Sequence, residues 1–222
     1  VLGITGTKGK SSTSAMVAHL LRAAGRRVVL AGNIGLPLLE LPDDTVADWW
    51  VLELSSFQTH DLDALPEIAV VLNLFPEHLD WHGSLARYYA DKLRLLGHDG
   101  RHPRVSVLNA LQEWPAGTLP PDGVRWFGAD AGFHVDDAAI RRGGQHVLAL
   151  DALPLPGRHN ALNLCAALAT VEACGEDALA LATAIATFKP LPHRLQPLGL
   201  RDGLQWVNDS IATTPHATLA AL

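Results

Sequence analysis

The run Thr5-Gly6-Thr7-Lys8-Gly9-Lys10-Ser11 combines glycines, cationic side chains and a hydroxyl in the pattern of a phosphate-binding loop. Glycines let backbone N–H groups approach phosphate oxygens, and the N-terminus of a following helix favours negative charge. We expect Lys10 to reach the outer phosphates of ATP and the Ser11 hydroxyl to ligate Mg²⁺. The first glycine of the strict pattern would fall at Ile4, so the strict pattern is not met. An ordinary glycine turn with solvated lysines is the alternative.

Two further polar segments follow apolar runs that are typical of buried strands. Glu53 ends one such run and precedes Ser55-Ser56-Phe57-Gln58. A carboxylate at the carboxyl end of a parallel strand suits Mg²⁺ beside phosphates. The segment Asn73–Asp80 places acid, imidazole and acid at the same expected edge. Taken alone, Glu53 could be a solvated strand end, and His78 could serve packing or hydrogen bonding because Mg²⁺ prefers oxygen ligands.

Several candidate residues in the rest of the chain are ambiguous when taken singly. Lys92 lies in a helix-like stretch and by itself would be a surface lysine. Asn160 offers an amide at the start of a predicted helix, where it could bond a heterocycle or cap the helix. Arg194 follows a proline-rich hinge, and a guanidinium carried by a second domain can clamp a transferring phosphoryl group. Asp209 could be an ordinary polar group of a loop.

The elements that must position these side chains alternate between apolar strands and helices. The phosphate loop lies between an apolar segment, residues 1–5, and a helix predicted over residues 10–24, whose apolar positions recur with a helical period. Buried strands that alternate with helices predict a mostly parallel α/β sheet flanked by helices. Further strands are expected at Arg27–Ala31, Trp49–Leu54, Ile68–Leu74 and Arg104–Leu108, and helices at Asn160–Ala173 and Ala178–Thr187.

The sequence pattern of the second half of the chain predicts short antiparallel strands and a domain boundary. Between residues 124 and 150, short β-like segments around a candidate turn at Arg141–Gln145 predict a small antiparallel annex. Lys189–Pro192 breaks the helical pattern, so we assign residues 1–190 to one domain and residues 191–222, which include a predicted strand pair, to the start of another. Because the chain opens at Val1 on an apolar strand, we expect a piece of a longer protein.

The composition of the chain argues against several classes of partner and environment. The 17 Lys+Arg and 23 Asp+Glu give a net charge of -6, which would repel a phosphate backbone, so nucleic acid is not expected. The longest weakly polar stretch, Ala178–Phe188, is far shorter than the roughly 20 apolar residues of a membrane span. Cys165 and Cys174 lie on opposite faces of one predicted helix and cannot pair with each other, which fits a reducing cytoplasm.

Taken together, the order of these motifs resembles the Mur ligase family, the ATP-dependent amino-acid-adding enzymes of peptidoglycan synthesis. The resemblance covers the whole chain. It implies a P-loop-containing central domain and the start of a Rossmann-like C-terminal domain, with the family's N-terminal UDP-binding domain absent from this chain. The matching segments are, in order, Thr5–Ser12, Glu53–Gln58, Asn73–Asp80 with Lys92 downstream, His159–Asn163, His193-Arg194 and Asp209-Ser210.

The resemblance also implies a role for each matching residue. It implies two Mg²⁺ ions held by Ser11, Glu53, His78 and a carbamylated Lys92, and catalytic roles for Lys10, Lys92, His78 and Arg194. Asn33 and Ser55 match positions near the metal and the muramoyl substrate. Asn160 and Asn163 would face the adenine, and Arg194 and Asp209 would contact phosphate and ribose. The implied ATP-binding set is Gly6, Thr7, Lys8, Gly9, Lys10, Ser11, Ser12, Asn160, Asn163, Arg194 and Asp209.

Within the family, Leu52–Gln58 and Leu191–Arg194 look most like the members that add glutamate to UDP-N-acetylmuramoyl-L-alanine. The usual D-glutamate pattern Asp-Ser-Lys-Ala-Thr-Asn is replaced here by Asp-Ser-Ile-Ala-Thr-Thr-Pro over residues 209–215, with Ile211 in place of the lysine. That departure is similar to a variant subgroup that adds L-glutamate. The resemblance therefore implies amide formation with L-glutamate through an acyl phosphate, by a cytoplasmic monomer. The piece alone is expected to bind ATP without ligating.

Two alternatives of different kinds remain at this point. A folylpolyglutamate synthase would share the loop and the fold and would also add glutamate, although the Ser55–Gln58 and Pro192–Arg194 segments favour the muramoyl substrate. A non-catalytic nucleotide-binding module would keep only the loop. The joint presence of Glu53, His78 and Lys92 argues against such a module, because a binder has no need of a second metal. A GTPase switch is disfavoured because the sequence has no Asn-Lys-x-Asp segment.

Overall fold

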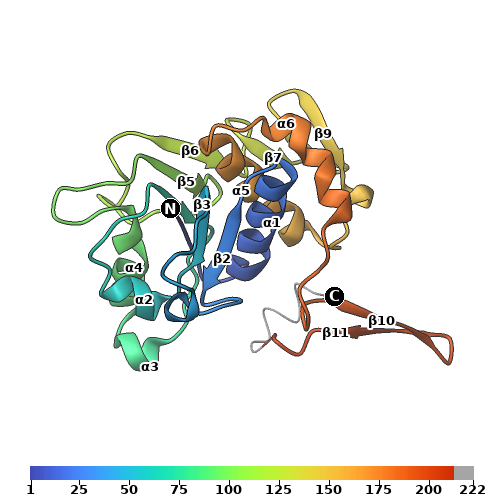
Figure 1. Ribbon diagram of the computed structural model, residues 1–222, viewed down its shortest axis with the longest axis horizontal. Helices are drawn as coiled ribbons and strands as arrows, with labels where there is room; N and C mark the ends of the chain where they lie inside the picture. Colours follow the sequence, from blue (N-terminus) through green and yellow to red (C-terminus); the bar gives the residue numbers. More distant parts are fainter. Residues whose placement is uncertain (213–222) are drawn as a thin grey trace.

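The computed structural model describes residues 1–212 and contains, within them, a nine-stranded sheet flanked by helices and a separate two-stranded sheet (Figure 1). The strand order is β2-β3-β1-β4-β5-β6-β7-β8-β9. The predicted mostly parallel α/β fold is confirmed. The strands of the parallel part are β1 (Leu2–Thr5), β2 (Val28–Gly32), β3 (Trp49–Glu53), β4 (Ile68–Val71), β5 (Val105–Asn109) and β6 (Val124–Phe127).

The central strands are buried on both faces, as their continuous apolar runs predicted. In β4, Ile68 and Val70 pack into one core cluster while Ala69 and Val71 pack into a second cluster on the opposite face. This division follows from the two-residue period of a strand. Helices α1 (Lys10–Ala23) and α5 (Arg158–Ala173) pack together over the first cluster. Helix α4 (Leu85–Leu93) and the short 3₁₀ helix η2 (Arg94–Leu96) contribute leucines to the second.

The predicted antiparallel annex is present and continues the main sheet. Strand β7 (Phe133–Val135) runs parallel to β6, and β8 (Ala139–Arg142) and β9 (Gln145–Ala149) then add in antiparallel order. The turn between β8 and β9 is Gly143-Gly144, where Gly143 has a φ of 56°, a conformation that favours glycine. Extension of an existing sheet edge lets this short hairpin share the core of the larger sheet.

The predicted helix over Ala178–Thr187 is wrong in its second half. Helix α6 (Ala178–Leu181) gives way to the 3₁₀ helix η4 (Ala182–Thr187). The carbonyl of Ala184 lies 2.9 Å from the Thr187 hydroxyl, which donates to it, and 2.9 Å from Nε2 of His19 on α1. Side chains that occupy carbonyls compete with the regular α-helical ladder and favour a tighter turn.

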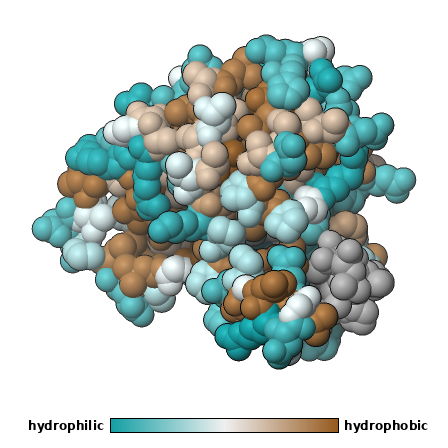
Figure 2. All heavy atoms as spheres, turned by 90° about the vertical axis from the view of Figure 1, so that its right-hand side faces the viewer, coloured by the Kyte–Doolittle hydropathy of each residue, from teal (hydrophilic) through white to brown (hydrophobic). Residues whose placement is uncertain are grey.

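The strand pair predicted within residues 191–222 is confirmed as the hairpin of β10 (Gln196–Arg201) and β11 (Leu204–Asn208). It projects from the body of the molecule (Figure 1), and seen from that side it exposes apolar side chains among polar ones (Figure 2). Residues 213–222 lie outside the described residues, and with them the Thr213–Pro215 part of the segment that bears on the choice of glutamate enantiomer.

The strand order brings the candidate site residues to one edge. Strand β1 lies between β3 and β4, all three parallel, so their carboxyl ends lie side by side. The phosphate loop follows β1, Glu53 ends β3, and Asn73 follows β4. Helix α2 (Ser56–His60) and helix α3 (Leu79–His82) begin just beyond these ends. Among residues 1–212, no helix is both long and apolar enough to cross a lipid bilayer.

Leu164 on α5 tests the contribution of the α1–α5 layer. Its side chain is fully buried in the larger core cluster, so Leu164→Ala should lower the free energy of unfolding by about 2–5 kcal/mol. Leu200→Ala in the exposed hairpin should change it by no more than about 0.5 kcal/mol. Denaturant titration of the full-length protein measures both values, and equal effects would contradict the assignment of Leu164 to the core.

Candidate active site

The loop between β1 and α1 has the backbone geometry of a phosphate cradle. Gly9 has a φ of 84° and immediately precedes α1, so the first helical N–H groups open toward the loop. A Cβ at Gly9 would meet the side-chain amide of Asn163 on α5, so a larger residue there would displace that amide and would also be strained at this φ. Ser11 and Ser12 are buried in the first turn of the helix. The loop can therefore present backbone amides to an anion.

Asn73 holds the loop in place, a role that the sequence did not predict for this residue. Its Oδ1 accepts a hydrogen bond from the backbone N–H of Lys8 at 2.8 Å, and its Nδ2 donates to the Lys8 carbonyl at 3.0 Å. The N–H of Thr7 donates to the Asn73 carbonyl at 2.9 Å. The signal available in the sequence was its position as the first polar residue after the buried run Ile68–Leu72. The end of β4 thus clamps the loop after β1.

Two lysine ammonium groups converge on the carbonyl oxygen of Gly6. Nζ of Lys10 donates to it at 3.0 Å and to the Thr7 carbonyl at 3.1 Å, while Nζ of Lys92 on α4 donates to the same Gly6 oxygen at 3.0 Å. Lys92 is only 2% exposed, and its Nζ lies 5.0 Å from the centre of the Tyr88 ring. The interpretation of Lys92 as a surface lysine is therefore wrong, because residues far away in the sequence enclose it.

Burial and charge repulsion change the protonation of both lysines. Burial, followed by the charge of Lys10, lowers the pKa of Lys92 from 10.5 to about 7, against the opposing effect of Glu77 and Glu53. Burial likewise lowers the pKa of Lys10. A substantial share of Lys92 is consequently a neutral amine near neutral pH, the form in which its nitrogen is a nucleophile.

Two carboxylates lie beside the lysines. Glu53 is almost fully buried, and Nδ2 of Asn33 donates to its Oε1 at 3.2 Å. Its Oε2 has no hydrogen-bond partner among residues 1–212. A buried carboxylate oxygen without a partner is costly, so this position fits a bound cation. Glu77, the first acid of the Asn73–Asp80 segment, was given no role of its own from the sequence, and it receives a 2.6 Å hydrogen bond from Nζ of Lys8.

His78 and Ser55 lie at the surface of the same region. His78 has a φ of 54°, its Nε2 lies 3.8 Å from Oε2 of Glu77, and its ring packs against Phe57 with centroids 5.3 Å apart. Its side chain is 47% exposed and remains accessible to a ligand. Ser55 caps helix α2 in a reciprocal capping box with Gln58. Its hydroxyl is thus engaged locally, although the residue is only partly buried.

The later motifs reach the loop from the C-terminal side. Nη2 of Arg194 donates to the Ser11 hydroxyl at 2.8 Å, which joins residues 183 positions apart. Asp209 accepts a hydrogen bond from the Leu195 N–H at 3.1 Å and so lies beside Arg194 in this segment. Nδ2 of Asn160 donates to the Pro156 carbonyl at 2.7 Å, so its amide takes part in the local structure at the helix start. Asn163, in contrast, lies against the phosphate loop.

The residues predicted as metal ligands do not form a conventional cluster of acids and imidazoles. Within the described part of the chain, no three His, Cys, Asp or Glu residues are placed together so that they could hold an ion. The predicted set also includes Ser11, which would bind through its hydroxyl oxygen, and Lys92, which could bind a cation only after modification. The fit to Mg²⁺ therefore depends on the unpaired oxygen of Glu53 and on chemistry at Lys92.

The Mur ligase middle domain matches residues 4–171, which is most of the chain and includes the phosphate loop, Glu53, His78, Lys92 and the start of α5. The chain belongs to the Mur ligase family. It is 57% identical over 227 aligned positions to the UDP-N-acetylmuramoyl-L-alanine–L-glutamate ligase of Xanthomonas euvesicatoria pv. vesicatoria strain 85-10, covering 100% of this chain and 48% of that protein. The chain thus spans about half the length of this curated relative.

Solved structures of the Mur ligase fold agree with the architecture. MurF from Acinetobacter baumannii superposes with a TM-score of 0.79 at 19% identity, covering 99% of this chain and 52% of that chain. Folylpolyglutamate synthase of Mycobacterium tuberculosis, solved with ADP and AMPPCP, has a TM-score of 0.71 at 20% identity, covering 99% of this chain and 64% of that one. At these identities the likeness concerns the fold alone, so it does not separate the two enzyme classes.

The lowered pKa of Lys92 predicts a pH dependence of stability. Between about 7, the folded pKa, and 10.5, the usual value, the unfolded chain binds more protons than the folded one. The free energy of unfolding should therefore rise with pH across this window, by up to about 1.4 kcal/mol per pH unit from this group. Lys92→Met should remove that contribution.

Denaturant titrations of the full-length protein in CO₂-free buffer at several pH values measure this slope. Lys189→Met, which changes an exposed lysine, is the matched control and should keep the slope. An unchanged slope in the Lys92→Met variant would contradict the buried, partly neutral state of Lys92.

Proposed function

We propose that the full-length protein is an ATP-dependent ligase that joins L-glutamate to UDP-N-acetylmuramoyl-L-alanine in peptidoglycan precursor synthesis. The observation that carries the proposal is the convergence of Lys10 and Lys92 on the phosphate loop of a Mur ligase middle domain. The name of the relative from Xanthomonas euvesicatoria supports the substrate pair and the L enantiomer. Ile211, in place of the lysine of the D-glutamate pattern, also supports the L enantiomer.

The proposed reaction has two steps. The terminal alanine carboxylate attacks the γ-phosphorus of ATP, which forms an acyl phosphate as the bond to ADP breaks. The amine of glutamate then attacks the carbonyl carbon, an amide bond forms, phosphate leaves and the amine loses a proton. Lys10 and Arg194 would neutralise charge on the transferring phosphoryl group, and positioning supplies much of the acceleration. The contact between Arg194 and Ser11 supports this assignment, since it brings the guanidinium to the loop.

Lys92 would act after conversion to a carbamate. The neutral nitrogen attacks the carbon of CO₂, an N–C bond forms, one C=O electron pair moves to oxygen, and one N–H proton passes to water. The product is an anion beside Lys10, so repulsion between two cations becomes attraction. Ser11, Glu53, His78 and this carbamate would hold two Mg²⁺ ions. Mg²⁺ there would neutralise charge on the phosphates of ATP.

The remaining site residues and the domain arrangement belong to the same proposal. Asn160 and Asn163 would face the adenine, Asp209 the ribose, and Asn33 and Ser55 the muramoyl substrate. Residues 1–190 would form the central ATP-binding domain and residues 191–222 the start of a Rossmann-like domain that binds the amino acid. The rest of the full-length protein would supply the UDP-binding domain. We place the reaction in the cytoplasm and propose that the full-length protein is a monomer. The present piece alone should not form the amide bond.

An assay of the full-length protein with each glutamate enantiomer tests the substrate. With ATP, Mg²⁺ and UDP-N-acetylmuramoyl-L-alanine, we expect amide product from L-glutamate and little from D-glutamate, detected by mass spectrometry. A folate acceptor offered in parallel should give no product. Product from D-glutamate alone would contradict the proposed enantiomer, and product from the folate would favour the folylpolyglutamate synthase alternative.

Substitution of Lys92 tests its modification. Lys92→Ala in the full-length enzyme should lower kcat by at least about 100-fold, because the carboxylate ligand is lost. Acetate or another short carboxylic acid should restore part of the activity, since it can occupy the vacated space as a carboxylate. Lys189→Ala is the exposed control and should remain active without added acid. Full activity of Lys92→Ala would contradict the carbamate role.

A further inference from the structure

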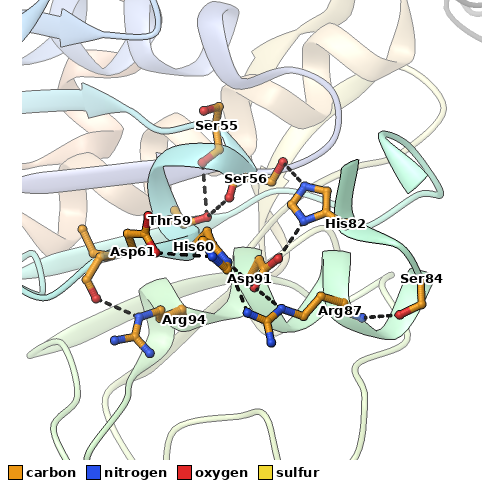
Figure 3. A network of polar contacts seen from close by, with 11 residues as sticks. Ser55, Ser56, Thr59, His60, Asp61, His82, Ser84, Arg87, Asp91 and Arg94 are labelled. Atoms are coloured by element: carbon orange, nitrogen blue, oxygen red, sulfur yellow. Dashed lines mark hydrogen bonds and ion pairs between the residues drawn. The ribbon is translucent and has the colours of Figure 1, made fainter. Parts of the chain in front are cut away.

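A buried chain of hydrogen bonds connects Ser56, His82 and Asp91 beside the candidate active site (Figure 3). Nδ1 of His82 lies 2.6 Å from Oδ2 of Asp91, and Nε2 of His82 lies 3.0 Å from the Ser56 hydroxyl. All three residues are less than a tenth exposed. When the Asp91 carboxylate accepts a hydrogen bond from Nδ1–H of His82, Nε2 of that tautomer accepts a hydrogen bond from the Ser56 hydroxyl.

The order serine, histidine, aspartate matches that of a hydrolytic triad, but the burial rules out that role. A nucleophilic serine must present its oxygen to a substrate. Ser56 is only 1% exposed, because it lies in the first turn of α2 beneath the residues around it. The chain of hydrogen bonds therefore acts on the protein itself and not on a substrate.

Each member of the chain lies close in sequence to one proposed metal ligand. Ser56 is three residues after Glu53, His82 is four residues after His78, and Asp91 is adjacent to Lys92. The three ligands come from different segments: Glu53 ends β3, His78 lies in the segment after β4, and Lys92 lies on α4. A link made through Ser56, His82 and Asp91 therefore joins the same three segments on their buried side.

Asp91 is the hub of this arrangement. Its second oxygen, Oδ1, lies 3.0 Å from Nδ1 of His60 on α2 and 3.0 Å from Nε of Arg87, one turn earlier on α4. His60 and Arg87 thus share Oδ1, while His82 engages Oδ2. With both oxygens engaged, the carboxylate is held firmly between α2, α3 and α4.

The same cluster reaches the phosphate loop. The ring of His82 packs edge-on against Tyr88, with centroids 5.1 Å apart. The Tyr88 hydroxyl lies 3.0 Å from Oγ1 of Thr7, and its ring lies under the Lys92 ammonium. A shift of His82 would therefore displace Tyr88, which contacts the loop and Lys92, as well as Ser56 at the start of α2.

We propose that Ser56, His82 and Asp91 are positioning residues that hold the segments carrying Glu53, His78 and Lys92 at their working separation. They contact neither ATP nor the reacting atoms, and they act through the three segments that they join. The inference rests on the proposed function, because the working separation matters only if these residues serve one site. A displacement of about 1 Å at such a site can cost on the order of 100-fold in rate.

The test uses Ser56→Ala and Asp91→Asn in the full-length enzyme. Each should lower kcat on the order of 10- to 100-fold while the KM for ATP changes by less than about threefold, because the reacting groups are misplaced whereas the loop still binds nucleotide. The double variant should lose little more than Asp91→Asn alone, since both changes interrupt one chain. Asp61→Asn, the same change in an exposed carboxylate that also touches His60, should keep wild-type kcat.

A readout independent of turnover is the carbamate itself. After incubation with ¹³C-bicarbonate, the carbamate signal of Lys92 in the ¹³C NMR spectrum should be weaker in both variants than in the wild type and in Asp61→Asn. If Asp91→Asn fails to fold, Ser56→Ala, which removes a single buried oxygen, decides the question.

Wild-type kcat together with a wild-type carbamate signal in folded Ser56→Ala would overturn the positioning role. This outcome is distinct from failure of the proposed function, in which the unsubstituted protein itself forms no amide. In that case the comparison of carbamate signals still tests whether the chain positions Lys92.

Discussion

The carbonyl oxygen of Gly6 accepts hydrogen bonds from two ammonium groups, that of the partly buried Lys10 and that of the buried Lys92, and the arrangement around the phosphate loop depends on this shared contact. Two like charges that each lie 3.0 Å from one oxygen atom repel strongly where water is excluded. Burial, and after it the charge of Lys10, lowers the pKa of Lys92 to about 7. A lysine that is partly neutral at physiological pH is a nucleophile, and its conversion to an anion would replace the repulsion from Lys10 by attraction.

The sheet order makes this contact possible. Strand β1 carries the loop between the ends of β3 and β4, so that Glu53 approaches from one side and Asn73 clamps the loop from the other. Helix α4 brings the Lys92 ammonium within 3.0 Å of the Gly6 carbonyl oxygen. Arg194 closes the set from the C-terminal segment by its contact with Ser11. Four segments that are distant in sequence thus converge on one loop, and three of them bring charged side chains to it.

The sequence predicted the parts of the site that follow from local rules. The glycine loop between a buried strand and a helix, the carboxylate at the end of β3 and the hairpin turn at Gly143-Gly144 are all recognisable within a few residues. Knowledge of the family added Lys92, which has no local signal. Asn73 and Glu77 were missed as site residues because their roles consist of contacts with the loop, more than 60 positions earlier.

By itself, the sequence determined the alternation of strands and helices and the phosphate loop, because hydrophobic period and glycine backbone freedom act between near neighbours in the chain. Local rules fail where a tertiary contact intervenes: the 3₁₀ helix η4 replaces the end of a predicted α-helix, at the point where His19 of α1 contacts the Ala184 carbonyl. Only the tertiary structure decided that Lys92 is buried, that it shares an acceptor with Lys10 and that Asp91 beside it joins three helices. Desolvation and charge repulsion depend on which groups the fold brings together, and the Gly6 carbonyl lies 86 residues from Lys92.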